Sequence, residues 1–239
     1  MTLRAAVIVF PGSNGERDLA EALTAVGFCV EYTRSDAHLP TGVQLIGLPG
    51  GFSYGDYWRA GMLASRDQAV RELPAAIQGG ALVIGICNGF QILVEAGLLD
   101  GALTYNSPPG FRHRWVTVEV AATGARSPWF FGVEPGTRLR LPMANGEGRY
   151  YHPDGEAGVA GRVPLRYVSN PNGSLASTAA LLDDSGRVLG VMPHPERASD
   201  PLLGSESGLA IFAAAARWLR TSAHHKTESN IAPEARSNP

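Results

Sequence analysis

The stretch from Gly80 to Gly97 constrains the fold most, because its hydrophobic period changes at Cys87. Ala81 to Ile86 is a short apolar run, typical of a strand that is buried on both faces of a parallel sheet. From Asn88 onward the apolar residues recur three or four positions apart, and Gly97 stands where a helix would end. The sequence therefore predicts a strand, a turn and a helix, with Cys87 on the turn.

Cys87 stands in a pattern that suits a nucleophile. Gly85-x-Cys87-x-Gly89 has the form of a nucleophile elbow, in which a strained turn raises the reactive side chain above the edge of the sheet. The N-terminus of the following helix would stabilise a thiolate over a thiol. Taken alone, the motif fits a buried structural cysteine equally well, since free cysteines are commonly buried.

Composition excludes several classes of protein. The chain has 239 residues and a formal charge of −2, from 20 Lys and Arg against 22 Asp and Glu, so no basic excess points to nucleic acid or to an anionic membrane surface. The apolar run from Ala5 to Phe10 is too short for a signal segment or a membrane span. Cys29 and Cys87 are too few for a disulfide framework, so a cytoplasmic location is expected.

The N-terminal half alternates short apolar strands with helical segments. We expect strands over residues 5–10, 28–33, 43–48 and 81–86, and helices over 16–26, 58–78 and from 88. Ser13 and Glu16 fit a capping box for the first helix, Pro74 would break the second, and Cys29 is interpreted as core packing. The order predicts an α/β fold with an open, doubly wound, mostly parallel sheet, whose sites lie beyond the carboxyl ends of the strands.

The third predicted strand runs into Pro49-Gly-Gly-Phe-Ser-Tyr-Gly-Asp56. A loop with glycines at 50, 51 and 55 can turn backbone N–H groups toward a ligand. An ordinary turn between a strand and a helix would have the same composition, so this loop alone does not establish a binding site.

The C-terminal half contains alternating segments that predict antiparallel strands at the edge of the sheet. They cover residues 114–120, 137–143, 165–169, 175–182 and 188–192, with Asp183-Asp-Ser-Gly186 as a hairpin turn. A final helix is expected over 207–220, which would end a single domain spanning 1–220. Residues 221–239 are almost free of apolar side chains and are predicted to form a disordered tail.

Pro193-His194-Pro195-Glu196 follows the last predicted strand. The prolines favour extended backbone, in which residues two apart face the same side, so Glu196 can orient the imidazole of His194. A lone histidine is more often a satisfied core or surface residue, and from the residues alone this alternative stays open.

Taken in order, these motifs resemble those of the class I glutamine amidotransferases, and among them the glutaminase subunits of phosphoribosylformylglycinamidine synthase. The resemblance covers nearly all of residues 1 to 220 and implies a flavodoxin-like arrangement of the sheet. The motifs that carry it are Pro11-Gly-Ser-Asn14, Pro49-Gly-Gly-Phe-Ser-Tyr-Gly-Asp56, Gly85-Ile-Cys-Asn-Gly-Phe-Gln91, Asn172-Gly-Ser174 and Met192-Pro-His-Pro-Glu-Arg197.

The resemblance implies a catalytic triad. Cys87 would attack the side-chain amide of glutamine, with His194 as the base and Glu196 orienting it. Backbone N–H groups of Gly51 and Asn88 would hold the oxyanion. Ammonia would pass to a large synthetase subunit that uses ATP, magnesium and formylglycinamide ribonucleotide, with a small third subunit in the complex. No metal or cofactor is expected in this chain itself.

Three further positions bear on the resemblance. Gln91 matches a substrate-contacting glutamine of the family, although it also suits a polar position on a helix face. Gly15 stands where the family usually has a cysteine, which removes a competing thiol. Asn145 replaces the histidine of the family's His-Gly-Glu-Gly pattern, so a role of that loop in glutamine binding or in signalling between subunits stays open.

Two other classes of function also remain open. A stand-alone flavodoxin-like cysteine hydrolase would share the elbow but need neither Gln91 nor a synthetase partner. A non-catalytic interaction subunit would keep the fold and lose the triad, which the intact Cys87, His194 and Glu196 argue against. For a glutaminase, the Gly50-Gly51 peptide is the expected movable element, since a flip would turn one oxyanion donor away at little steric cost.

Overall fold

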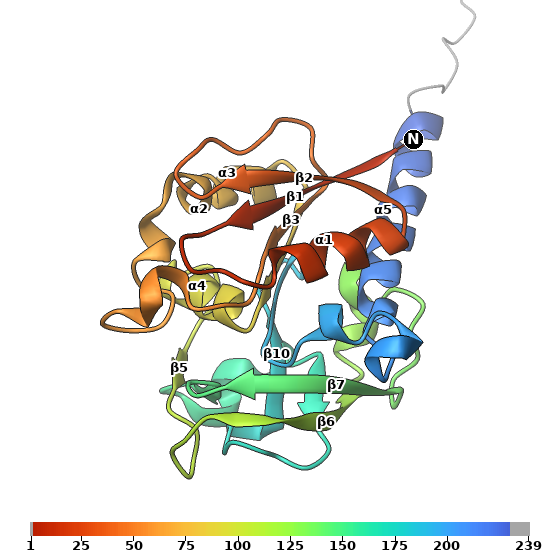
Figure 1. Cartoon of the computed structure of the whole chain (residues 1–239). Coiled ribbons are helices and arrows are strands. Elements are labelled where there is room, and N and C mark those ends of the chain that lie inside the picture. The colour runs from red at the N-terminus through yellow and green to blue at the C-terminus, as the bar shows by residue number, and fades with distance from the viewer. Residues whose placement is uncertain (1, 230–239) are drawn as a thin grey trace, which may run out of the picture.

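The computed structural model describes residues 2–229, and its centre is a nine-stranded sheet (Figure 1). The sheet has the order β2-β1-β3-β4-β11-β10-β9-β6-β7. Its strands are β1 (Leu3–Val9), β2 (Phe28–Arg34), β3 (Leu45–Leu48), β4 (Leu82–Ile86), β6 (Arg112–Val120), β7 (Arg138–Asn145), β9 (Leu165–Tyr167), β10 (Thr178–Leu182) and β11 (Val188–Val191). A separate ribbon pairs β5 (Ala102–Thr104) with β8 (Arg149–Tyr151).

The sheet has a parallel half and an antiparallel half, as the sequence predicts. Every neighbouring pair from β2 to β11 is parallel. Every pair from β11 to β7 is antiparallel. Each residue of β3, β4, β10 and β11 is buried, which explains why these strands are apolar, apart from Thr178 at the start of β10, and do not alternate.

The α-helices cover both faces of the parallel half (Figure 1). Their bounds are α1 (Glu16–Ala25), α2 (Gln68–Arg71), α3 (Leu73–Gln78), α4 (Asn88–Glu95) and α5 (Leu209–Ser229). A Cβ on Gly47 would lie 2.7 Å from Leu19 of α1, whereas Gly89 of α4 packs against Leu48. Because successive strand residues face opposite sides, α1 and α4 lie on opposite faces of β3.

Three expectations about the N-terminal half are wrong. No side chain caps α1, whose N-cap is Gly15; the hydroxyl of Ser13 instead donates to the carbonyl of Phe10 at 3.0 Å. The predicted helix over 58–78 is reduced to a 3₁₀ turn, α2 and α3, since the chain at Gly61 has a positive φ and lies against the α4 backbone. Cys29 is exposed on β2, the edge strand of the sheet, and does not pack in the core.

The end of the chain also differs from the expectation. Helix α5 continues to Ser229, so residues 221–229, predicted to belong to a disordered tail, are helical. Within this helix, the hydroxyl of Thr221 donates to the carbonyl of Arg217 at 3.0 Å. The rest of that predicted tail, residues 230–239, lies outside the described residues. Between residues 2 and 229, no helix is both long and apolar enough to cross a membrane.

Candidate active site

Cys87 lies on a strained turn between β4 and α4. Its backbone has φ 50° and ψ −101°, a conformation that residues with a Cβ rarely adopt and that is often found at functional sites. The flanking glycines make this turn possible. A Cβ on Gly89 would lie 2.1 Å from the carbonyl oxygen of Leu48, and a Cβ on Gly85 would lie 2.5 Å from that of Gly89. The predicted elbow is therefore present in the structure.

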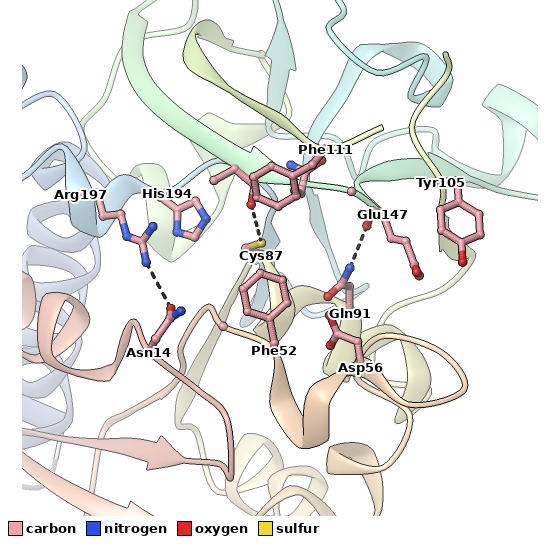
Figure 2. Close-up of a pocket in the computed structure, with 14 residues that line it drawn as sticks. Asn14, Phe52, Asp56, Cys87, Gln91, Tyr105, Phe111, Glu147, His194 and Arg197 are labelled. Atoms are coloured by element: carbon pink, nitrogen blue, oxygen red, sulfur yellow. Dashed lines mark hydrogen bonds between the residues drawn. The ribbon is translucent and has the colours of Figure 1, made fainter. Parts of the chain in front are cut away.

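The thiol of Cys87 lies in the wall of a cavity. Its backbone N–H donates to the carbonyl of Val191 at 2.8 Å, which ties the turn to the end of β11. The residue is only 7% exposed, and Sγ lies 3.6 Å from the carbonyl oxygen of Ala144 (Figure 2). As the N-cap of α4, Cys87 lies where the helix dipole favours a negative charge.

His194 and Glu196 form a buried pair beside Cys87. Nδ1 of His194 lies 2.6 Å from Oε1 of Glu196, and the two residues are 2% and 1% exposed. Burial favours the neutral imidazole, but the negative charges of Glu196 and Cys87 outweigh burial and raise the pKa of His194 above its ordinary value. Nε2 of His194 is buried and makes no hydrogen bond within residues 2–229, so this nitrogen is free to exchange a proton with a reacting group.

The Gly50-Gly51 peptide has a fixed orientation. The carbonyl of Gly50 accepts hydrogen bonds from the backbone N–H groups of Asn14 at 3.2 Å and Gly15 at 3.1 Å. Because a trans peptide holds its N–H opposite its carbonyl, these bonds turn the Gly51 N–H away from α1. The expected flip of this peptide would break both bonds. These two bonds add a cost to the flip beyond sterics, and the flip itself stays a prediction.

Gly51 also has no room for a side chain. Its φ is 146°, and a Cβ would lie 2.6 Å from Cα of Ser13. The Asn88 N–H lies in the first turn of α4, where no intrahelical acceptor exists. The loop after β3 and the start of α4 thus present two backbone donors near Cys87, as the sequence predicts, and their role as an oxyanion hole stays a proposal.

A cavity of about 230 Å³ joins these groups to solvent (Figure 2). Four predicted site residues line it: Gly51, Cys87, Gln91 and His194. Asn145, which the sequence analysis singled out, also lines the cavity, together with side chains to which sequence reasoning gave no role: Asn14, Phe52, Asp56, Tyr105, Phe111, Glu147 and Arg197. Asn14, Phe52, Asp56 and Arg197 stand within motifs that carry the family resemblance, and those motif positions were the available signal.

Hydrogen bonds link the wall of the cavity to α4. The side chain of Asn88 accepts from the Ser53 N–H at 3.0 Å, and it donates to Asp56 at 3.2 Å and to Gln91 at 2.9 Å. Gln91 in turn donates to the carbonyl of Glu147 at 2.8 Å. Both ends of the Gln91 amide thus bind protein atoms, so the expected contact between Gln91 and substrate stays a prediction.

Asn145, where the sequence departs from the family pattern, lines the same cavity. It is 3% exposed, and neither Nδ2 nor Oδ1 has a hydrogen-bond partner in the described part of the chain. A buried amide without partners is costly, which points to a polar ligand at this wall. Among the side chains that the structure describes, those of residues 2–222, no three His, Cys, Asp or Glu residues converge as metal ligands.

Comparisons with known proteins agree with this geometry. A family model described as a CobB/CobQ-like glutamine amidotransferase domain matches residues 2–219. The phosphoribosylformylglycinamidine synthase subunit PurQ of Ruegeria sp. (strain TM1040) is 44% identical over 216 residues, which cover 89% of this chain and 96% of that protein. The PurQ of Thermotoga maritima is 44% identical over 220 residues, covering 92% and 100%.

Solved structures give the same result. The structure of PurLQS from Thermotoga maritima contains a chain that superimposes with a TM-score of 0.84 at 44% identity, covering 92% of this chain and 100% of that one. A glutamine amidotransferase from Thermotoga maritima superimposes with a TM-score of 0.55 at 15% identity, covering 98% and 87%. This more distant likeness concerns the fold alone.

Proposed function

Because the chain belongs to the CobB/CobQ-like glutamine amidotransferase family, and within it to the phosphoribosylformylglycinamidine synthase subunits PurQ, we propose that it hydrolyses glutamine and supplies ammonia for purine biosynthesis. One observation carries the chemistry. Cys87 lies on a strained elbow and shares one cavity with His194, whose imidazole is held by a buried carboxylate.

In the first half of the reaction, the thiolate of Cys87 adds to the side-chain amide carbon of glutamine. The N–H groups of Gly51 and Asn88 stabilise the oxyanion, and each such donor typically contributes about 3 kcal/mol. Protonated His194 gives its proton to the amide nitrogen, and the C–N bond breaks. Ammonia leaves, and a thioester remains on Cys87.

In the second half, His194 removes a proton from water as the water attacks the thioester. The oxyanion forms again in the same place, the C–S bond breaks, and glutamate leaves with the Cys87 thiolate restored. Glu196 accepts from Nδ1–H throughout, so it keeps Nε2 directed at the reacting atoms and stabilises the imidazolium.

The ammonia is used by another subunit. The solved structure of PurLQS supports an assembly with a large synthetase and a small third subunit, and we infer the same partners for this chain. ATP and magnesium would act in the synthetase, where formylglycinamide ribonucleotide becomes formylglycinamidine ribonucleotide. We also infer a cytoplasmic location, in keeping with two free thiols.

Exposed aromatic side chains support docking over the cavity. Phe52, Tyr105 and Phe111 line the cavity and are each more than half exposed, and Tyr57 and Trp58, a few residues after Phe52 in the sequence, are exposed as well. Clustered exposed aromatic residues are typical of protein interfaces, and a partner bound here would receive ammonia from Cys87 directly. A stand-alone hydrolase would have no use for this surface.

Labelling with a diazoketone analogue of glutamine tests the proposal. Such an analogue alkylates a thiolate only after it occupies the glutamine site, so peptide mapping should find the adduct on Cys87, with excess glutamine protecting it. Cys29 is the internal control, because it is the more exposed thiol but has no base beside it. Equal labelling of both cysteines, unaffected by glutamine, would contradict the proposal.

A further inference from the structure

We propose that Asp56 and Glu147 bind the α-ammonium group of the substrate and thereby select a free amino acid with a side-chain amide. The inference rests on the proposed glutaminase function and concerns which part of glutamine this wall of the cavity recognises. Figure 2 shows both carboxylates on the side of the cavity that lies away from His194 and Arg197.

The two carboxylates come from separate loops and lack a cation. Asp56 follows β3, and Glu147 lies between β7 and β8. Among the side chains of residues 2–222, neither has a salt-bridge partner. Burial and the charge of Glu147 raise the pKa of Asp56 to about 6, as expected where negative charges meet without compensation. A bound ammonium group would supply the missing positive charge.

The backbone holds Asp56 in this position at a conformational cost. Tyr54, Gly55 and Asp56 all have left-handed φ angles, 53°, 69° and 53°. Strained residues of this kind cluster at ligand sites, where other contacts hold them in place. Here the Tyr54 N–H donates to the carbonyl of Pro11 at 2.7 Å, and the Tyr54 hydroxyl donates to Asp67 at 2.9 Å.

Helix α4 sets where both carboxylates lie relative to the nucleophile. Asn88 binds the carboxylate of Asp56, and Gln91 binds the backbone of Glu147. Cys87 is the N-cap of the same helix. An amino acid whose amide carbon lies at Cys87 therefore faces Asp56 and Glu147, which are both hydrogen-bonded to the same helix.

Asn145 is a second and independent indication of a polar ligand. Its amide is nine-tenths buried or more, both polar atoms lack partners, and it lines the same cavity. Nδ2 is a donor that suits an α-carboxylate, the acceptor that accompanies the α-ammonium. Arg197, the cation on the opposite side, already lies 3.1 Å from Asp18 and 3.6 Å from Glu196, so its charge is compensated within the protein.

A substrate without the ammonium group tests the proposal in the intact complex. Glutaramate is glutamine with the α-ammonium replaced by hydrogen, so the ratio of kcat/KM for glutamine to that for glutaramate reports binding of this group alone. The ratio should fall by about ten- to hundred-fold in Asp56→Asn, the usual loss for a hydrogen bond to a charged group. Glu147→Gln should also lower the ratio of the two kcat/KM values. If Asp56→Asn fails to fold, Glu147→Gln serves as the test variant.

Two comparisons make the test decisive. Glu134→Gln removes an exposed carboxylate outside the cavity and should leave the ratio unchanged. A ratio that stays at the wild-type value in both Asp56→Asn and Glu147→Gln, or that collapses in Arg197→Met instead, would overturn the inference while glutamine hydrolysis itself stands. A wild-type complex that releases no glutamate from glutamine would overturn the proposed function, and the inference with it.

Discussion

Replacing Glu196 with glutamine tests how the buried carboxylate acts on His194. The substitution keeps the size of the side chain and removes its charge. Glu196 is 1% exposed and His194 is 2% exposed, so water can replace little of the lost interaction. We expect Glu196→Gln to lower kcat for glutamine hydrolysis and to leave KM nearly unchanged, because Glu196 does not line the cavity.

The size of the effect follows from the geometry. Nδ1 and Oε1 are 2.6 Å apart, so the imidazolium and carboxylate charges are in direct contact. Two unit charges about 4 Å apart attract by about 4 kcal/mol at an effective dielectric constant of 20. Since each 1.36 kcal/mol corresponds to a factor of ten in rate, the loss of this attraction should lower kcat by up to about a thousand-fold.

Steady-state release of glutamate, measured with the complete complex, gives both constants. Ammonia-dependent synthesis in the same preparation shows that the variant still folds and assembles. A kcat within threefold of the wild-type value would refute the assignment of Glu196, as would a large rise in KM at constant kcat.

Three further predictions concern packing and charge. Gly89→Ala should destabilise the chain by about 1–3 kcal/mol in urea unfolding, because the new methyl group would lie 2.1 Å from the Leu48 carbonyl; Gly146→Ala, whose Cβ meets only Phe111 at 3.9 Å, should show no comparable loss. The pKa of Asp56 is raised to about 6, so the folded protein carries an unfavourable negative charge on this carboxylate above pH 6. The carboxylate becomes protonated, and the unfavourable term is lost, as the pH falls toward the ordinary pKa of an aspartate. Asp56→Asn should therefore stabilise the protein at pH 7.5 by about 1 kcal/mol after solvent screening, and that gain should vanish near pH 4. The KM for glutamine should rise as the pH falls below 6 in the wild type but not in Asp56→Asn, and a KM with the same pH dependence in both proteins would contradict this.

Much of the parallel half of the fold can be predicted from local pattern. Continuous apolar runs identify β3, β4 and the part of β1 from Ala5 onward, because strand positions buried on both faces are apolar. The change of period at Cys87 places the elbow. His194 is extended, as its position before Pro195 predicts, but the expected extended segment does not continue, because Pro195–Arg197 form a 3₁₀ turn from which Glu196 reaches Nδ1. These features depend on residues close together in the sequence.

Other features depend on tertiary contacts and could not be predicted in this way. Cys29 is exposed because it lies on the edge strand β2. Whether a side chain on this strand is exposed depends on which other elements cover it, and the residue type does not reveal that. Asp56 and Glu147 belong to loops far apart in the sequence, and only the tertiary fold brings both to one cavity. The hydrogen bonds that fix the Gly50 carbonyl come from Asn14 and Gly15, so glycine composition alone suggested a mobility that the contacts oppose.

The most direct test of the central claim uses Cys87→Ala in the reconstituted complex. If Cys87 only generates ammonia, the variant should lose glutamine-dependent synthesis of formylglycinamidine ribonucleotide while synthesis from added ammonium salts continues at the wild-type rate. Retention of glutamine-dependent synthesis in Cys87→Ala would contradict the account.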